Sequence, residues 1–232
     1  FGEIREMHPL LTPKLTNATI RRAVRDYLNG GARKQRVVTK YGDISNWDVS
    51  NVTNMEEVFY DAGSFNQPLN KWNVSNVTTM SSMFWVATSF NQPLNDWNVS
   101  NVKSMEWMFS NARSFNQPLN NWDVSNVTNM GWMFEGASSF SQELNKWNVS
   151  NVVDLREMFL EATSFNRPLN KWNVSNVTSM RYMFVRAGSF KQPLNKWNVS
   201  NVADVFGMFL GATSFNQTLH APDQFHARGH VY

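Results

Sequence analysis

Residues 69–93 read LNKWNVSNVTTMSSMFWVATSFNQP, and closely similar stretches precede and follow them without an insertion or deletion. Tryptophan recurs in the same phase every 25 residues, as do two phenylalanines and a leucine of the unit. The recurring tryptophans are Trp47, Trp72, Trp97, Trp122, Trp147, Trp172 and Trp197. Because a fixed period of roughly 20 to 50 residues is typical of solenoids and propellers, the chain is expected to be a repeat protein.

Two patterns follow each other within the unit. The segment from Trp72 to Val74 alternates apolar and polar residues, which predicts a short strand with Asn73 facing outward. Apolar residues at spacings of three and four then predict about two turns of helix. These residues are Met80, Met83, Phe84 and Ala87.

Such a unit cannot bury its apolar stripe alone, whereas stacked units cover one another. A propeller blade needs about 40 residues, so the period argues against a propeller. The sequence therefore predicts an α/β repeat solenoid of seven coils. Each coil is expected to hold one short parallel strand and one short helix, and the tryptophans are expected to stack.

A Ser-Asn pair also recurs in every unit, from Ser50-Asn51 to Ser200-Asn201. Stacked asparagines can bond to each other and to turn backbone along the array, so we interpret the column as a structural ladder. Two alternatives are glycosylation at the Asn-x-Ser/Thr sequences and an ice-binding array. The threonine column that ice binding would use is broken at Lys103, Val153 and Ala203.

The composition excludes several classes of site. With 42% hydrophobic and 17% charged residues among 232, the chain can form a core. It has no cysteine, which excludes disulfides, a thiol nucleophile and cysteine-ligated metals. No apolar run approaches the roughly 18 residues that a membrane-spanning helix needs.

We expect three parts: a basic N-terminal segment with a capping helix at 1–40, the repeats at 41–219, and a C-terminal cap or tail at 220–232. Residues 1–40 hold nine Lys/Arg against three Asp/Glu, whereas the rest of the chain is net acidic. A basic segment can contact nucleic acid, acidic lipid or acidic protein. Because no nucleic-acid motif accompanies it, a solvated cap is the simpler interpretation, and no nucleic-acid partner is expected.

The two ends differ from the middle. Ile20, Ala23, Val24, Tyr27 and Leu28 form a helical stripe that Thr19 or Asn17 can cap and that Gly30-Gly31 ends. Such a helix would cover the first coil. The tail contains His220, His226 and His230, but only Asp223 accompanies them, so no metal site and no cofactor are expected.

The unit resembles the repeats of the BspA-like leucine-rich repeat family of surface proteins. The resemblance rests on the string WNVSNVTxMxxMFxxAxSFNQPL and covers about residues 41–219. The family's apolar positions are occupied in the second copy by Val74, Val77, Met80, Phe84, Ala87 and Phe90. The resemblance implies a right-handed leucine-rich-repeat solenoid used for adhesion or protein binding, at the cell surface or outside the cell.

No residue pattern indicates catalysis. No nucleophile–base pair, carboxylate pair or phosphate loop stands out from the repeat, and the family that the unit resembles is not defined by any catalytic residue. We therefore expect no catalytic residues and no enzyme.

Binding residues are expected in the columns that vary between copies, because stacking does not dictate them. Exposed Trp, Tyr and Arg are the residues that most often form binding hot spots. The candidates are Tyr60, Trp85, Trp107, Trp132, Arg156, Arg181, Tyr182 and Arg186, on the convex side of the array. The alternative is that these aromatic residues lean over neighbouring coils and extend the core.

The leading hypothesis is a non-enzymatic interaction or adhesion module that presents one face to a protein, or else to a glycan. The alternative is a structural or scaffold subunit of a large assembly, such as a virion shell or an organellar complex. The sequence predicts no particular oligomeric state.

Overall fold

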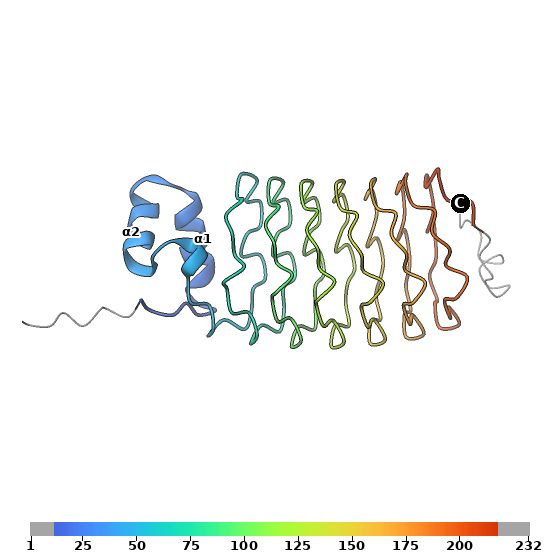
Figure 1. Ribbon diagram of the computed structural model, residues 1–232, viewed down its shortest axis with the longest axis horizontal. Helices are drawn as coiled ribbons and strands as arrows, with labels where there is room; N and C mark the ends of the chain where they lie inside the picture. Colours follow the sequence, from blue (N-terminus) through green and yellow to red (C-terminus); the bar gives the residue numbers. More distant parts are fainter. Residues whose placement is uncertain (1–11, 218–232) are drawn as a thin grey trace, which may run out of the picture.

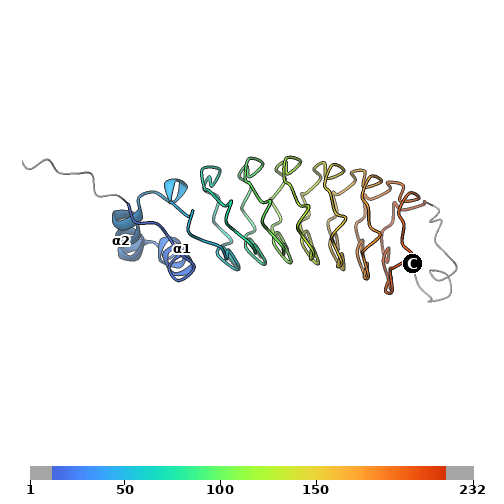
Figure 2. The same cartoon turned by 90° about the horizontal axis from the view of Figure 1, so that it is seen from below.

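The structure is a computed structural model that describes residues 12–217. Helix α1 spans Ile20–Leu28, helix α2 spans Gly31–Tyr41, and the short 3-10 helix η1 spans Ile44–Asn46. The two α-helices lie at one end of the molecule, and the 25-residue coils follow side by side in a row (Figures 1 and 2). We number the coils from the tryptophan that begins each one, so that coil 1 starts at Trp47 and coil 2 at Trp72.

The short helix expected in each coil is absent from the described coils, and consecutive turns take its place. In coil 2 the amides of Met83 and Ala87 bond back to carbonyls three residues earlier. The amides of Ser82 and Phe84, on either side of Met83, donate to carbonyls of coil 3 at 2.8 and 2.9 Å. A helix would keep all of these bonds within one segment. Some amides of these turns donate to the next coil instead. The turns nevertheless bury residues at spacings of three and four, which is the pattern that predicted a helix.

The expected strand at Trp72–Val74 is also not formed. A turn bonds the Trp72 amide to the Leu69 carbonyl, and a second turn bonds the Val77 amide to the Val74 carbonyl, so the chain bends on both sides. Trp72 and Val74 are nonetheless buried, and Asn73 is exposed. Parallel pairing between coils occurs at a different position of the unit, where each coil forms one isolated β-bridge with the next. The bridged residues are Asn54, Thr79, Ser104, Asn129, Asp154, Ser179 and Asp204.

Like residues of successive coils pack on one another inside the row. Phe84 and Phe109 stack with ring centroids 5.5 Å apart, and Trp147 and Trp172 stack at 6.5 Å. From Trp72 onward, the indole N–H of each tryptophan that begins a coil donates to a carbonyl 28 residues earlier in the chain, as Trp122 does to Leu94 at 2.9 Å. A tryptophan therefore buries a large apolar surface while its polar atom stays paired. One hydrophobic cluster runs from Leu15 to Phe215.

The predicted asparagine ladder is present in the form of bonds from the asparagine side chains to turn backbone. The Asn76 side chain donates to the Ser50 carbonyl of the preceding coil at 2.8 Å, and the equivalent bond recurs in every later coil. These bonds satisfy turn carbonyls, which is why the column repeats.

Helix α1 covers the first coil. The Asn17 side chain accepts hydrogen bonds from the Thr53 and Asn54 amides, and Arg21 donates to the Glu56 carbonyl at 2.7 Å. Tyr27 packs edge-on against Trp47 at 5.8 Å. The helical segment thus gives coil 1 the partners that a preceding coil would give.

Three details at this end differ from expectation. Neither proposed capping side chain bonds the start of α1: Thr19 bonds Thr16, and Asn17 bonds coil 1. Leu28 is exposed although it lies on the predicted stripe. Helix α2 was not predicted and extends to Tyr41, past the expected boundary after residue 40.

Candidate functional site

The outer wall of each coil is the run of consecutive turns, residues 55–62 in coil 1. Two positions of this run have positive φ in every coil, and Glu57 and Asp61 represent them with φ of 58° and 55°. Left-handed backbone favours glycine, yet only Gly136, Gly207 and Gly211 occupy these positions. The fold thus imposes a backbone conformation here without imposing a side chain.

Aromatic side chains of four successive coils meet on this wall. Ring centroids are 4.9 Å apart between Tyr60 and Trp85, 5.3 Å between Trp85 and Trp107, and 4.5 Å between Trp107 and Trp132. The Arg156 guanidinium lies over the Trp132 ring, 5.0 Å from its centroid. We call these five side chains the aromatic ridge. It joins coils 1 to 5, and five of the eight predicted binding residues lie in it.

Trp107 and Trp132 stack along the row of coils, whereas the Tyr60–Trp85 and Trp85–Trp107 ring pairs are tilted by 45° and 38°. The planes of Trp107 and Trp132 are within 8° of each other, and Arg156 covers the second face of Trp132. Both faces of Trp132 are therefore covered by side chains of neighbouring coils. Tyr60 is 47% exposed, and the three tryptophans are partly buried.

Polar side chains fix the position of Arg156. Its guanidinium pairs with the Asp154 carboxylate at 2.5 Å. The hydrogen bond to Asp154 is the main reason that the pKa of Arg156 is raised, so the cation persists at any physiological pH. The charge at the end of the ridge is therefore permanent and held in place.

The other three predicted residues lie further along the wall. The Arg181 guanidinium lies 4.6 Å from the centroid of Tyr182 and 4.7 Å from that of Phe206, and it pairs with Asp204 at 3.6 Å. Arg186 pairs with Glu161 at 2.8 Å instead of joining this group. The sequence analysis did not include Phe206 among the candidate binding residues. Phe206 stands in the same variable column as Arg156 and Arg181, and that position could have identified it.

Gly207 shows how closely this second group is packed. Its φ is +60°, and a Cβ placed there would meet the Tyr182 ring at 2.5 Å. The neighbouring ring therefore selects glycine at this point, whereas the backbone alone does not, since Glu157 and Tyr182 occupy the equivalent position with positive φ.

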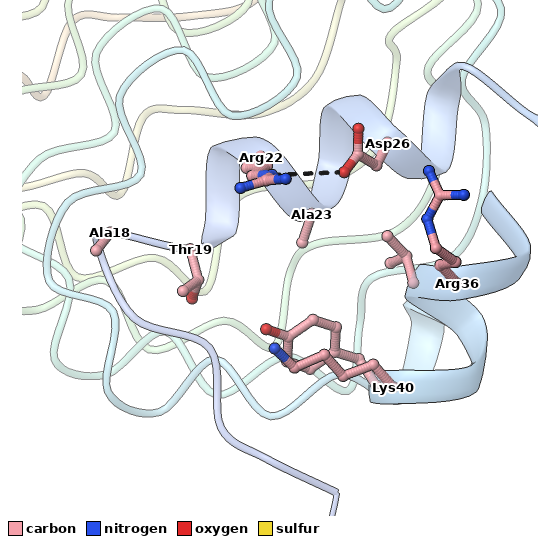
Figure 3. Close-up of a pocket in the computed structure, with 9 residues that line it drawn as sticks. Ala18, Thr19, Arg22, Ala23, Asp26, Arg36 and Lys40 are labelled. Carbon is pink, nitrogen blue, oxygen red and sulfur yellow. Dashed lines mark ion pairs between the residues drawn. The ribbon is translucent and has the colours of Figure 1, made fainter. Parts of the chain in front are cut away.

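A hollow of about 370 Å³ lies between α1 and α2 (Figure 3). Ala23, Val37 and Tyr41 form its apolar part, and basic side chains of the N-terminal segment surround it. Arg22 pairs with Asp26 at 3.8 Å, and Lys40 lies 5.0 Å from the centroid of the Tyr41 ring. These contacts are consistent with the simpler interpretation of the basic residues as parts of a solvated cap.

Within residues 12–217, no three histidine, aspartate or glutamate side chains lie close enough together to hold a metal ion. The predicted histidine tail at 220–232 is outside the described residues. No helix of the described part combines the length and apolar character that crossing a bilayer requires.

Comparison with known proteins finds a match to a protein family. The family model described as "Mycoplasma protein of unknown function, DUF285" matches residues 32–145 and again residues 117–222. No curated protein and no solved structure matches the chain. The two matches overlap and together span most of the sequence, including every coil and all of the aromatic ridge. The chain therefore belongs to the DUF285 family, whose members are built from repeated units.

Proposed function

We propose that this chain is a BspA-like leucine-rich-repeat solenoid that acts as a non-enzymatic protein-interaction or adhesion module. In this proposal, the stacked coils form a stiff support, and the aromatic ridge is the surface that contacts the partner. The family match and the 25-residue period support the repeat architecture. The ridge is the observation that carries the function.

The ridge has the composition of a protein-binding hot spot. Trp, Tyr and Arg dominate such hot spots because they combine large apolar area with a polar tip. The partly exposed indoles of Trp85, Trp107 and Trp132 form one continuous apolar strip that ends at the fixed charge of Arg156. A partner that covers this strip would bury apolar surface without disturbing the coils.

A protein partner fits the ridge better than a glycan does. Sugars stack on the open faces of aromatic rings, whereas the two faces of Trp132 are taken by Trp107 and Arg156. Ring edges and indole N–H groups remain for contact, and these suit the side chains and carbonyls of a protein.

The fold does not require these tryptophans. Positions equivalent to Trp107 and Trp132 hold Ser82, Glu157 and Gly207 in other coils, with the same positive φ. Extension of the core, the alternative interpretation, would not explain why the aromatic residues gather in coils 1 to 4 at two different columns.

The test exchanges the ridge for residues that the repeat already uses. The double variant Trp107→Ser and Trp132→Glu takes its residues from coils 2 and 5. Partners captured by the wild-type protein from its native source are identified, purified and titrated against both proteins. We expect affinity to fall by about tenfold or more, the usual effect of removing a hot spot. The control is Asn173→Asp, a substitution that the repeat already contains at Asp48 and Asp123.

Unchanged binding by the double variant would refute the ridge as the contact surface. Sizing of the native complex tests the alternative of a structural subunit. Recovery of the chain only within one large particle of fixed stoichiometry, such as a virion shell or an organellar complex, would favour that alternative. A free chain at the cell surface would favour adhesion.

A further inference from the structure

One corner of coils 4 and 5 departs from the repeat at several neighbouring positions. The corner reads Asn-Gln-Pro in coils 1 to 3, but Ser-Gln-Glu at 141–143, Asn-Arg-Pro at 166–168 and Lys-Gln-Pro at 191–193. Stacking places Ser141, Glu143 and Arg167 next to each other, since equivalent positions of successive coils are in contact. Three departures at one place suggest that something other than stacking selects them.

The regular corner is a second ladder of amides. The Asn91 side-chain oxygen accepts the Asn116 amide at 3.0 Å and the Gln117 side chain at 3.1 Å, and the same pattern joins the other regular coils. Ser141 has no amide to continue this ladder. Arg167 instead donates to the Ser141 carbonyl at 2.8 Å and pairs with Glu143 at 3.3 Å.

A hollow of about 440 Å³ lies beside this corner. Its polar lining consists of Asn120, Gln142, Glu143, Asn145, Lys146 and Lys171. No aromatic side chain lines it, and Pro118 supplies its apolar part. Pockets for drug-like apolar ligands are lined mainly by hydrophobic and aromatic side chains, so this hollow suits a polar ligand.

The charged side chains that line the hollow indicate which ligand charge it would bind. Lys146 and Lys171 belong to successive coils and stand in the same column, which brings two like charges together. The one carboxylate of the hollow, Glu143, is already paired with Arg167. The hollow therefore has an excess of positive charge that a single anionic group would balance.

We propose that this hollow binds an acidic sugar, that is, a pyranose unit carrying one carboxylate. Lys146 and Lys171 pair with the carboxylate of the sugar. The Gln142 side-chain nitrogen already donates to Asn116, and the Asn145 side chain already bonds Asn170 and the Lys171 amide. The Gln142 side-chain oxygen and the remaining amide protons of Asn120 and Asn145 are left for ring hydroxyls, and Glu143 accepts from a hydroxyl. The Glu143 carboxylate also disfavours a dianionic phosphate group, which carries more charge than a carboxylate and presents no hydroxyl donor to it. The site is separate from the aromatic ridge, so it does not depend on the function proposed for that surface.

The test uses a matched pair of probes, methyl glucuronide and methyl glucoside, which differ only in the carboxylate. Each is titrated into the full, isotopically labelled chain, and backbone amide signals are followed by NMR. We expect saturable shifts at Lys146 and Lys171 with the glucuronide, at a dissociation constant on the order of 1 mM. We expect binding of the glucoside to be at least about tenfold weaker.

Two variants locate the site. The repeat-restored variant Ser141→Asn, Glu143→Pro and Arg167→Gln returns the corner to the sequence of coils 1 to 3, so its fold is expected to be intact. Lys146→Gln with Lys171→Gln leaves the backbone untouched and removes the charge. Each is expected to weaken glucuronide binding at least about tenfold.

Equal binding of the glucoside would overturn the proposal. So would wild-type affinity in the repeat-restored variant, or the absence of saturable shifts at the two lysines. Sodium propionate serves as the carboxylate without a sugar. If it bound as tightly as the glucuronide, the hollow would be a simple charge patch and not a sugar site.

Discussion

Two positions only two residues apart in each coil differ in what they tolerate. The position of Phe59 holds phenylalanine in all seven coils. The position of Glu57 holds Glu57, Ser82, Trp107, Trp132, Glu157, Tyr182 and Gly207. The first side chain is buried against the equivalent ring of the next coil, as Phe59 is against Phe84 at 5.4 Å. The second has positive φ in every coil.

The difference separates two kinds of constraint. Packing against an identical neighbour fixes the shape of a side chain, so a change in one coil affects two interfaces. A backbone constraint fixes only φ and ψ, and any residue that tolerates the strain can occupy the position. The outer wall is therefore the part of the coil that is free to acquire a binding surface, and the aromatic ridge occupies it.

The largest effect is expected inside the row. Phe109 is fully buried and stacks with Phe84, Phe115 and Phe134 at 4.1 to 5.7 Å. Phe109→Ala should lower the free energy of unfolding by about 3–5 kcal/mol, because it opens a cavity between two coils. Urea unfolding measures the change. Trp107→Ser, two residues away on the outer wall, should lower it by only about 1 kcal/mol, the stacking contribution of one partly exposed ring.

Equal losses in these two variants would mean that burial does not distinguish the two positions. The different residues found at the two positions would then have to be explained by backbone conformation alone.

A smaller effect should appear where the backbone is strained. Val86 has a φ of +61°, which is unfavourable for a β-branched residue. Val86→Gly should raise the free energy of unfolding by about 0.5–1 kcal/mol, because glycine removes that strain. Val153 is 42% exposed and does not have positive φ, so Val153→Gly should lower it by about 0.5–1 kcal/mol. Changes of the same sign in both variants, again measured in urea, would contradict the strain argument.

The sequence predicts inward and outward positions better than it predicts local structure. Trp72, Val74 and Asn73 face as the alternation indicates, and the Ser-Asn ladder is present. The helix at Met80–Ala87 was wrong, because consecutive turns bury the same spacing of residues as a helix does. Glycine at the left-handed positions would have indicated turns instead of a helix. Glutamate, tryptophan and tyrosine occupy several of these positions, so the sequence does not reveal the positive φ.

The candidate site was predictable as a set of columns but not as a set of contacts. The contact between Trp85 and Trp107 joins positions that differ by three residues within the coil, and only the turn geometry places them together. Phe206 was missed for the same reason, since its contact with Tyr182 is also diagonal.

The smallest effect concerns a position where aspartate and asparagine alternate between coils. Asp123 accepts a hydrogen bond from the Ser125 amide at 3.0 Å, as Asn73 accepts one from Ser75 at 3.2 Å. The pKa of Asp123 is lowered mainly by the hydrogen bond from the Ser125 side chain. The hydrogen bond from the Ser125 backbone amide lowers this pKa further. The two residue types therefore make the same turn, but only aspartate adds a dependence on pH.

Since the folded pKa of Asp123 is lowered, its contribution to stability is fully present above the unfolded value of about 4 and is lost as pH falls through the folded value. Asp123→Asn should therefore lose part of the acid sensitivity below about pH 4 and keep neutral-pH stability, since the amide oxygen accepts the same bond. The reverse variant, Asn98→Asp, should gain acid sensitivity over the same range. Thermal melting from pH 2 to 7 measures both changes. If the two variants followed the wild-type profile, the carboxylate would contribute nothing beyond the turn that asparagine already makes.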